Sequence, residues 1–364
     1  MGVAGGLGRV TIRKAMEPPI RLMIVDDSSV ARAVLSRIIE TYDGFEIAAL
    51  AGSAADALAA LQSIQVDIVL LDLEMPGISG LQALPEILAA GEGARVLVVS
   101  SHAAAGAEAT VQALALGAAD TLPKPNATGL AGRFADMLAD RLRLIGRVRR
   151  EPVPTRREPM PRFDLRPMPE GPIGCVAIGA STGGLPALNQ FLAAWPRGTG
   201  APILVTQHLP PAFIPVFARQ LEAGSGRQAI VVADGQPLAA DRIHVAPGDA
   251  HLRVEVQGQL VVARLSREPA SSGCLPSVDP MLASVGVLFR ETAVGVVLSG
   301  MGKDGLDGAG TLVERGGAIL AQDRPSSSVW GMPRAVAEAG LASAVLSPVE
   351  LARRLTARLE ANAR

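Results

Sequence analysis

A serine lies in the glycine-rich segment AIGASTGG, which spans residues 177–184. Gly179, Ser181 and Gly183 match the pattern GxSxG, in which a sharp turn presents a serine hydroxyl for attack on an acyl carbon. That pattern needs a strand before the turn and a helix after it, and the flanking sequence predicts both. The plain alternative is a serine or threonine that caps a helix N-terminus, which is common.

Two phosphate-binding templates fit this turn less well. A P-loop needs a lysine after its glycines, and none follows here. A dinucleotide fingerprint needs a middle glycine, which Ser181 replaces, and an acidic residue about twenty positions later. No Asp or Glu occurs between Gly179 and Leu221. The segment therefore favours a nucleophilic serine, provided that a base and an orienting acid exist elsewhere.

The best base is His208, because it follows the predicted strand Ile203–Gln207. If that strand is a parallel neighbour of the one before Ser181, the two side chains meet at one sheet edge. His251 is the reserve candidate. The other two histidines lie in the first half of the chain and within a strand, at His102 and His244.

The best acid is Asp304, in the turn GMGKDGLDG that follows the predicted strand Val294–Ser299. The same turn also spells GxGxxG at residues 300, 302 and 305, and Asp323 stands roughly where a ribose ligand would fall. The residue pattern alone therefore does not exclude a dinucleotide-binding site at this turn. The short predicted helix, Leu306–Arg315, argues against it. The order Ser, His, Asp differs from the orders of α/β-hydrolases, chymotrypsin-like enzymes and subtilisins.

The first half of the chain holds an acidic group with a lysine. Asp26 and Asp27 end its first predicted strand, and Asp72 ends its third. The carboxyl ends of neighbouring parallel strands lie side by side, so these carboxylates need a cation, and Mg²⁺ prefers oxygen ligands. Ser100 and Lys124 follow the fourth and fifth strands and could hold an anion there. This set fits phosphorylation of one aspartate.

These side chains require two α/β units. In the first, five predicted strands alternate with helices and imply a doubly wound parallel sheet: Arg21–Val25, Phe45–Leu50, Asp67–Leu71, Arg95–Val99 and Asp120–Leu122. In the second, four more runs read as buried strands: Ile173–Ile178, Ile203–Gln207, Val294–Ser299 and Ala318–Ala321. Between them we predict an antiparallel patch: Ile243–Val245, His251–Val256 and Gln259–Leu265.

The domain prediction is a disordered tail at 1–19, a regulatory domain at 20–142, an Arg/Pro-rich linker at 143–171 and a catalytic α/β domain at 172–364. Over 364 residues, 34 basic and 35 acidic side chains nearly cancel, which indicates no nucleic-acid partner. No apolar run is long enough to enter a bilayer as a spanning helix, and the first residues lack a signal-peptide core. Two cysteines without a CxxC pattern fit a reducing cytoplasm with no zinc site.

The motifs RLMIVDDSSVAR, LLDLEMPGISGL, VVSS and PKP make residues 20–142 resemble a response-regulator receiver domain with a flavodoxin-like sheet. The resemblance implies Asp72 as the phospho-acceptor of a two-component phosphorelay. It implies Mg²⁺ ligation by Asp26, Asp27 and Asp72, and sensing of the phosphoryl group by Ser100 and Lys124. Many receivers have an aromatic residue three positions before this lysine, where it acts as a conformational switch. In this chain that position holds Thr121.

The segments AIGASTGG, TQHLPP, APGD, PSVD, LSGMGKDG and GMPRAV resemble, in this order, the catalytic domain of the chemotaxis protein-glutamate methylesterase (CheB) family. The resemblance implies a Rossmann-like domain with Ser181 as nucleophile, His208 as base and Asp304 as its orienting acid. Backbone N–H groups near Thr182 and Met301 would stabilise the oxyanion, with no cofactor in the esterase site. Leu275 stands before PSVD, where the family often has arginine.

The resemblance also implies a cytoplasmic hydrolase with partners. Its substrates would be methylated glutamates of chemoreceptors, and it would deamidate receptor glutamines as well. A chemotaxis histidine kinase would be the phosphodonor. Neither nucleic acid nor membrane insertion is expected.

Overall fold

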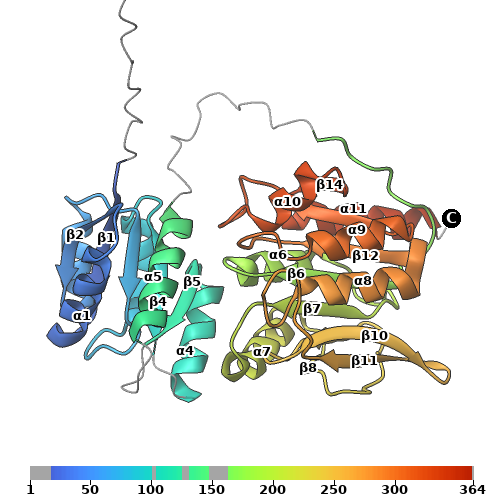
Figure 1. The fold of residues 1–364 in the computed structure, drawn as a ribbon, viewed down its shortest axis with the longest axis horizontal. Helices are drawn as coiled ribbons and strands as arrows, with labels where there is room; N and C mark the ends of the chain where they lie inside the picture. The colour runs from blue at the N-terminus through green and yellow to red at the C-terminus, as the bar shows by residue number, and fades with distance from the viewer. Residues whose placement is uncertain (1–17, 101–103, 125–130, 147–162, 363–364) are drawn as a thin grey trace, which may run out of the picture.

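The computed structural model describes residues 18–100, 104–124, 131–146 and 163–362, and Figure 1 shows their arrangement. The predicted tail falls almost wholly outside these ranges, as does much of the predicted linker. Two parallel sheets, each covered by helices, lie side by side in Figure 1. No helix in the described ranges is long and apolar enough to cross a membrane.

The N-terminal domain is a five-stranded parallel sheet in the order β2-β1-β3-β4-β5. The strands are β1 (Ile20–Val25), β2 (Phe45–Ala51), β3 (Ile68–Leu71), β4 (Arg95–Ser100) and β5 (Asp120–Pro123). All five predicted strands are confirmed, and each differs from its prediction by one residue at one end. The order reverses next to β1, and such a switch point opens a crevice at the carboxyl ends of β1 and β3.

Helices cover both faces of this sheet. One face packs against α1 (Ser29–Glu40) and α5 (Ala131–Gly146). The other packs against α2 (Ala54–Leu61), α3 (Gly80–Ala90) and α4 (Ala104–Ala115). Ser28, Ser53 and Ser79 accept hydrogen bonds from the first turns of α1, α2 and α3 and so fix where these helices begin. Helix α5 continues to Gly146, four residues past the predicted end of the domain.

The C-terminal domain is a seven-stranded parallel sheet in the order β14-β13-β12-β6-β7-β9-β8. Its strands are β6 (Cys175–Ala180), β7 (Ile203–Gln207), β8 (Ala229–Val231), β9 (Ile243–Val245), β12 (Ala293–Val297), β13 (Ala318–Gln322) and β14 (Ala342–Leu346). β6, β7, β12 and β13 are buried along their whole length, which explains their continuous apolar runs.

Helices again cover both faces. One face carries α6 (Gly184–Ala194), α7 (Ile214–Ser225), which follows the short 3₁₀ helix η1 (Pro211–Phe213), and α11 (Pro348–Asn362). The other face carries α8 (Val278–Phe289), α9 (Leu306–Glu314) and α10 (Met332–Glu338), and the short 3₁₀ helix η2 (Arg290–Thr292) follows α8. Helix α9 ends one residue before the predicted limit.

The predicted antiparallel patch is partly confirmed. β10 (His251–Gln257) and β11 (Leu260–Ser266) form an antiparallel hairpin. The prediction is wrong for Ile243–Val245, because this segment is β9 and pairs in parallel with both β7 and β8. The hairpin packs on α8, where Ser284 Oγ accepts a hydrogen bond from the Val254 N–H at 3.1 Å.

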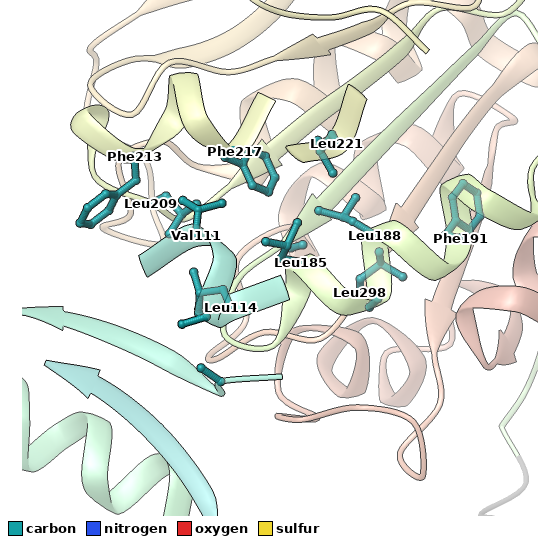
Figure 2. Packing of buried hydrophobic residues seen from close by; sticks show 14 of the residues in the cluster. Val111, Leu114, Leu185, Leu188, Phe191, Leu209, Phe213, Phe217, Leu221 and Leu298 are labelled. Atoms are coloured by element: carbon teal, nitrogen blue, oxygen red, sulfur yellow. The ribbon is translucent and has the colours of Figure 1, made fainter. Parts of the chain in front are cut away.

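An apolar core continues from one domain into the other. Val111 and Leu114 of α4 are buried, and Figure 2 shows them beside Leu209 and Phe213 of the C-terminal domain. The α2–α4 face of the N-terminal sheet and the α6–α7 face of the C-terminal sheet therefore share one buried cluster. In this structure the two domains form a packed unit rather than two separate globules.

Phe217 tests how much this cluster contributes to stability. It is fully buried in α7 (Figure 2), so Phe217→Ala should lower the free energy of unfolding by about 3–5 kcal/mol through lost burial and a residual cavity. Both tryptophans, Trp195 and Trp330, lie in the C-terminal domain, so their fluorescence in a urea titration reports this domain. Leu260→Ala, at an exposed position of the hairpin, is the control and should change the free energy of unfolding by less than about 0.5 kcal/mol.

Candidate active site

Ser181 lies in the tight connection between β6 and α6. Gly183 has φ of 70°, and a Cβ there would lie 2.2 Å from the Ser328 Cβ, so only glycine fits. The Ser181 backbone is held by its N–H, which donates to the Ser299 carbonyl at 3.0 Å, and by its carbonyl, which accepts from Gln207 Nε2 at 2.8 Å. The serine is therefore fixed at the carboxyl end of β6, as the sequence predicts.

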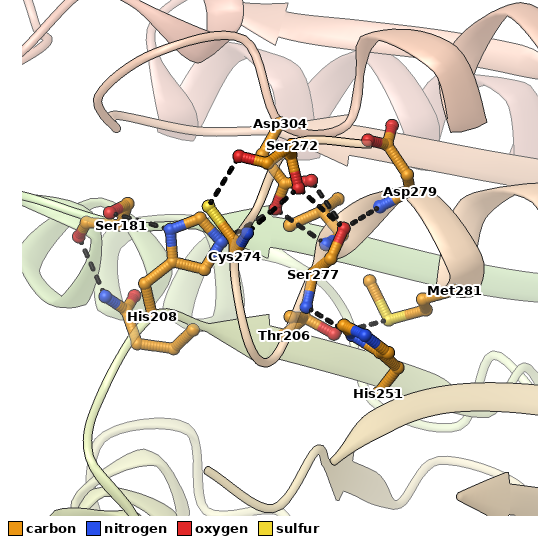
Figure 3. A network of polar contacts seen from close by, with 12 residues as sticks. Ser181, Thr206, His208, His251, Ser272, Cys274, Ser277, Asp279, Met281 and Asp304 are labelled. Carbon is orange, nitrogen blue, oxygen red and sulfur yellow. Dashed lines mark hydrogen bonds and ion pairs between the residues drawn. The ribbon is translucent and has the colours of Figure 1, made fainter. Parts of the chain in front are cut away.

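His208 directly follows β7, the parallel neighbour of β6. Ala180 pairs with Gln207, so the residues after each strand lie next to each other. His208 Nδ1 lies 3.1 Å from Ser181 Oγ. On its other side, His208 Nε2 lies 2.7 Å from Asp304 Oδ2 (Figure 3). Because an ionised carboxylate only accepts hydrogen bonds, Nε2 carries the proton and Nδ1 presents a lone pair to the serine hydroxyl.

Asp304 is buried in the turn between β12 and α9, with 2% of its surface exposed. Its Oδ2 also accepts from the Val278 N–H at 2.8 Å, and its Oδ1 accepts from Ser277 Oγ at 2.6 Å. Burial opposes ionisation of this carboxyl group. The hydrogen bonds from His208, Ser277 and Val278 outweigh that effect and hold the pKa of Asp304 below its usual range.

His251, the reserve base of the sequence analysis, has a different position. Its Nδ1 accepts a hydrogen bond from the Ser277 N–H at 2.8 Å, and its Nε2 donates to the Glu268 carbonyl at 2.8 Å. Both ring nitrogens are thus engaged with the backbone, and the ring supports the residue that binds Asp304. Ser277 was not singled out from the sequence, although it lies in the PSVD motif.

The turn that contains Asp304 is a poor dinucleotide site despite its GxGxxG spelling. Asp304 puts a buried negative charge at the point where a pyrophosphate would approach the helix N-terminus. Asp323, the supposed ribose ligand, accepts from the N–H and Oγ of Ser326 within its own turn. The acidic residue that the dinucleotide alternative needs for the ribose is therefore engaged within its own turn.

Two backbone N–H groups close to Ser181 in the fold have no hydrogen-bond acceptor among the described residues. Across the described ranges, the N–H groups of Thr182 and Met301 make no hydrogen bond, whereas the next N–H, of Gly183, donates to the Ala119 carbonyl at 2.9 Å. The Thr182 side chain points elsewhere, to Asp120. Open N–H groups beside a candidate nucleophile are what stabilisation of an oxyanion needs.

The acidic site of the N-terminal domain is assembled as the sequence predicts. Carboxylate oxygens of Asp26, Asp27 and Asp72 lie within 4.8 Å of one another. Lys124 Nζ lies 3.1 Å from Asp26 Oδ2 and 2.8 Å from Asp72 Oδ2. Ser100 Oγ is buried and has no hydrogen-bond partner in the described part of the chain. The oxygen-only donor set and the unpaired hydroxyl fit a magnesium ion and an incoming phosphoryl group.

The electrostatics of this site follow from the buried acids. Burial raises the pKa of Asp72, although Lys124 opposes the rise. Burial also opposes the charge on Lys124, but the hydrogen bonds to Asp72 and Asp26 outweigh it, and the pKa of Lys124 is raised. The positive charge of the lysine therefore partly offsets the negative charge of the two carboxylates.

A contact between the domains reaches the residue after Ser181. Asp120, the first residue of β5, accepts hydrogen bonds from Thr182 Oγ1 at 2.6 Å and from the Arg141 guanidinium. Arg95, at the start of β4, donates to the Ser328 carbonyl. Asp120 was not singled out from the sequence, because nothing in a single strand indicates which residue of another domain it will contact.

Leu275 and Cys274 flank the site. Leu275, which replaces the arginine frequent in the resembling family, is half exposed. Cys274 is partly buried, and its Sγ contacts the Ser272 carbonyl at 3.9 Å. The thiol lies close to the imidazole and the carboxylate of the site, as Figure 3 shows.

Comparison with known proteins gives consistent matches along the chain. Residues 176–355 match the CheB methylesterase family, and residues 22–131 match the response regulator receiver domain. A protein-glutamate methylesterase/protein-glutamine glutaminase of Caulobacter vibrioides is 44% identical over 90% of this chain and 95% of its own length. One of Paramagnetospirillum magneticum is 39% identical over 92% of this chain and 94% of its own. The catalytic domain of Thermotoga maritima CheB methylesterase superposes with a TM-score of 0.50 at 32% identity, covering 52% of this chain and all of that domain.

The depressed pKa of Asp304 predicts a pH-dependent contribution to stability. A carboxyl group with a lowered folded pKa stabilises the fold above its unfolded pKa of about 4, and this stabilisation is lost as the pH falls towards the folded value. Asp304→Asn should therefore cost about 2–4 kcal/mol at pH 7, and the cost should shrink below about pH 4. Urea titrations followed by tryptophan fluorescence, at pH 7 and below about pH 4, would measure this cost in the free energy of unfolding. The exposed Asp307→Asn is the control, and a cost for Asp304→Asn that does not change with pH would contradict the assignment.

Proposed function

This chain belongs to the CheB methylesterase family, and from that membership we propose that Ser181, His208 and Asp304 form its catalytic triad. The protein is a protein-glutamate methylesterase/protein-glutamine glutaminase with a receiver domain, and it acts in chemotaxis adaptation. One observation carries the assignment of residues: an unbroken line of hydrogen-bonding distances from Ser181 Oγ through the imidazole to Asp304.

Hydrolysis begins when Ser181 Oγ attacks the γ-carbonyl carbon of a glutamate methyl ester and gives its proton to His208 Nδ1. Asp304 stabilises the imidazolium that forms and keeps the ring oriented through Nε2. The tetrahedral intermediate collapses, and methanol leaves with the proton from Nδ1. Water then attacks the acyl-enzyme, again losing a proton to Nδ1, and releases the glutamate carboxylate and the serine. With a glutamine side chain the leaving group is ammonia.

The oxyanion of each tetrahedral intermediate requires donors aimed at the carbonyl oxygen. The Thr182 and Met301 N–H groups fill this role in the proposal. Thr182 directly follows Ser181, and Met301 follows Gly300, where a Cβ would lie 2.9 Å from the Ser181 Cβ. Neither N–H has a hydrogen-bond partner among the described residues. Removing one such donor typically costs about 10²–10³-fold in rate. Gly302 follows Met301 with φ of 74°, so the turn that aims the Met301 N–H depends on a glycine.

The substrates we propose are methylated glutamates on the cytoplasmic helices of chemoreceptors, which places the reaction in the cytoplasm. A chemotaxis histidine kinase supplies the phosphoryl group to Asp72. Asp26, Asp27 and Asp72 would hold Mg²⁺, which neutralises the charge that develops during phosphoryl transfer. Lys124 and Ser100 then bind the new phosphoryl oxygens.

The proposal includes restraint of the esterase by the receiver domain, which packs beside Ser181. A cavity of only about 10 Å³ lies between the domains at Ser181, lined by Leu114 and Asp120 from one side and by Thr182 from the other. A volume of that size holds about one water molecule. In the proposal, phosphorylation of Asp72 shifts the domains towards an open arrangement and so gives a methylated glutamate access to Ser181.

Ser181→Ala should abolish hydrolysis, with a loss of at least about 10³-fold in methanol release from methylated receptor. The variant removes the nucleophile but no core contact. Ser271→Ala is the matched control, because this serine is exposed and its hydroxyl donates to Asp307 Oδ2 at 2.7 Å, away from the Ser181 hydroxyl. If Ser181→Ala retained most of the activity, the serine would not be the nucleophile.

Asp120→Ala should raise the rate of the unphosphorylated enzyme up to about tenfold, because it removes the charged acceptor that holds Thr182 across the interface. The added effect of a phosphodonor should shrink accordingly. Asp136→Ala removes an exposed receiver acid that binds Tyr42 and serves as the control. An unchanged basal rate in Asp120→Ala would contradict a role of this contact in restraint.

A further inference from the structure

The fold brings a third metal-ligating side chain to the histidine and aspartate of the active site. Cys274 precedes α8 by four residues, and its Sγ lies within 4.8 Å of ligand atoms of both His208 and Asp304. His208 Nε2 and Asp304 Oδ2 are 2.7 Å apart. The three residues come from separate loops at one edge of the sheet, as Figure 3 shows.

We propose that His208, Cys274 and Asp304 form an inhibitory site for a thiophilic divalent cation, with zinc as the best fit. Imidazole, thiolate and carboxylate are the ligand types that zinc takes in proteins, and three protein ligands with an open fourth position are common at catalytic zinc sites. Mg²⁺, which suits the receiver carboxylates, prefers oxygen alone and would not select this set.

The geometry requires only small movements. Zinc–ligand bonds of about 2.0–2.3 Å in a tetrahedron place the ligand atoms roughly 3.3–3.7 Å apart. The imidazole and carboxylate would separate slightly to admit the ion, and the thiol would approach. Gly273 precedes the cysteine and nothing lies within 4 Å of the position of its missing Cβ, so its loop has room to adjust.

The charges also match. A carboxylate and a thiolate together balance the two positive charges of the ion. Burial and the negative charge of Asp304 raise the pKa of the Cys274 thiol, so without metal the thiol keeps its proton. Binding replaces the S–H bond by a zinc–sulfur bond and releases the proton to water.

Metal binding and catalysis exclude each other at the imidazole. If zinc occupies Nε2, the remaining ring proton lies on Nδ1, which faces Ser181. An N–H at that position cannot accept the serine proton, so the general base is lost. This consequence rests on the proposed triad, whereas the metal site itself rests only on the position of the three ligands.

Metal binding is tested with Co²⁺ as a spectroscopic substitute for zinc in the full-length protein. Titration of reduced protein should produce a thiolate-to-cobalt charge-transfer band that is absent in Cys274→Ser and is removed by adding zinc. Cys175→Ala is the matched control, because it deletes the other thiol, which is fully buried, and should leave the band. A band that persists in Cys274→Ser, or no band in the wild-type chain, would overturn the proposal.

Inhibition is tested by methanol release from methylated receptor with increasing Zn²⁺, and with Mg²⁺ as the control ion. Cys274→Ser should hydrolyse the ester in metal-free buffer, and its half-inhibitory zinc concentration should rise more than about tenfold. Inhibition of both proteins at the same zinc concentration would overturn the proposal. A Cys274-dependent cobalt band without any zinc inhibition would support the metal site and contradict instead the assignment of His208 as base.

Discussion

The register of three neighbouring parallel strands is the constraint on which the candidate active site depends. β12 pairs with β6 and β6 pairs with β7, so that Val297 lies opposite Gly179, and Ala180 lies opposite Gln207. Because all three strands run the same way, their connecting turns emerge at one edge of the sheet. Ser181 and His208 are the first residues after their strands. A shift of one residue in either pairing would point the adjoining side chain to the opposite face of the sheet.

This constraint explains what the sequence could reveal. A buried parallel strand is a continuous apolar run, so its end is visible, and the polar residue that follows stands out. Ser181, His208 and Asp72 were selected as candidates in this way, and Asp304 was selected from the glycine-rich turn that follows β12. The three-residue segment Ile243–Val245 carries no signal of strand direction, and it was wrongly placed beside the hairpin instead of in the parallel sheet. A strand of three residues is too short for its apolar pattern to show whether it pairs in parallel or antiparallel, and this limited the fold prediction.

The supporting residues were harder to predict because they come from elements that do not end at the same edge. Ser277 caps α8 and donates a hydrogen bond to Asp304, and His251 begins a hairpin strand and accepts one from the Ser277 N–H. Their contacts depend on how helix and hairpin pack, which local sequence does not encode. The need for them is nevertheless physical. A carboxylate with 2% exposure stays ionised only if several donors replace water, and Asp304 has three. Asp279 nearby illustrates the opposite case, since burial and the charge of Asp304 raise its pKa to about 6.

The short strand β5 connects the acidic site of the receiver domain to the interdomain contact beside Ser181. β5 has four residues, from Asp120 at the interdomain contact to Pro123, and Lys124 follows directly. Lys124 is tied to Asp72 and Asp26, while Asp120 is tied to Thr182 beside the candidate nucleophile. A strand hydrogen-bonded to β4 along its length cannot bend freely between its ends. In the proposed regulation, a phosphoryl group on Asp72 draws Lys124 to a new partner. The displacement is then carried along β5 to the hydrogen bond at Thr182 without requiring an aromatic switch residue, which is consistent with the threonine at position 121.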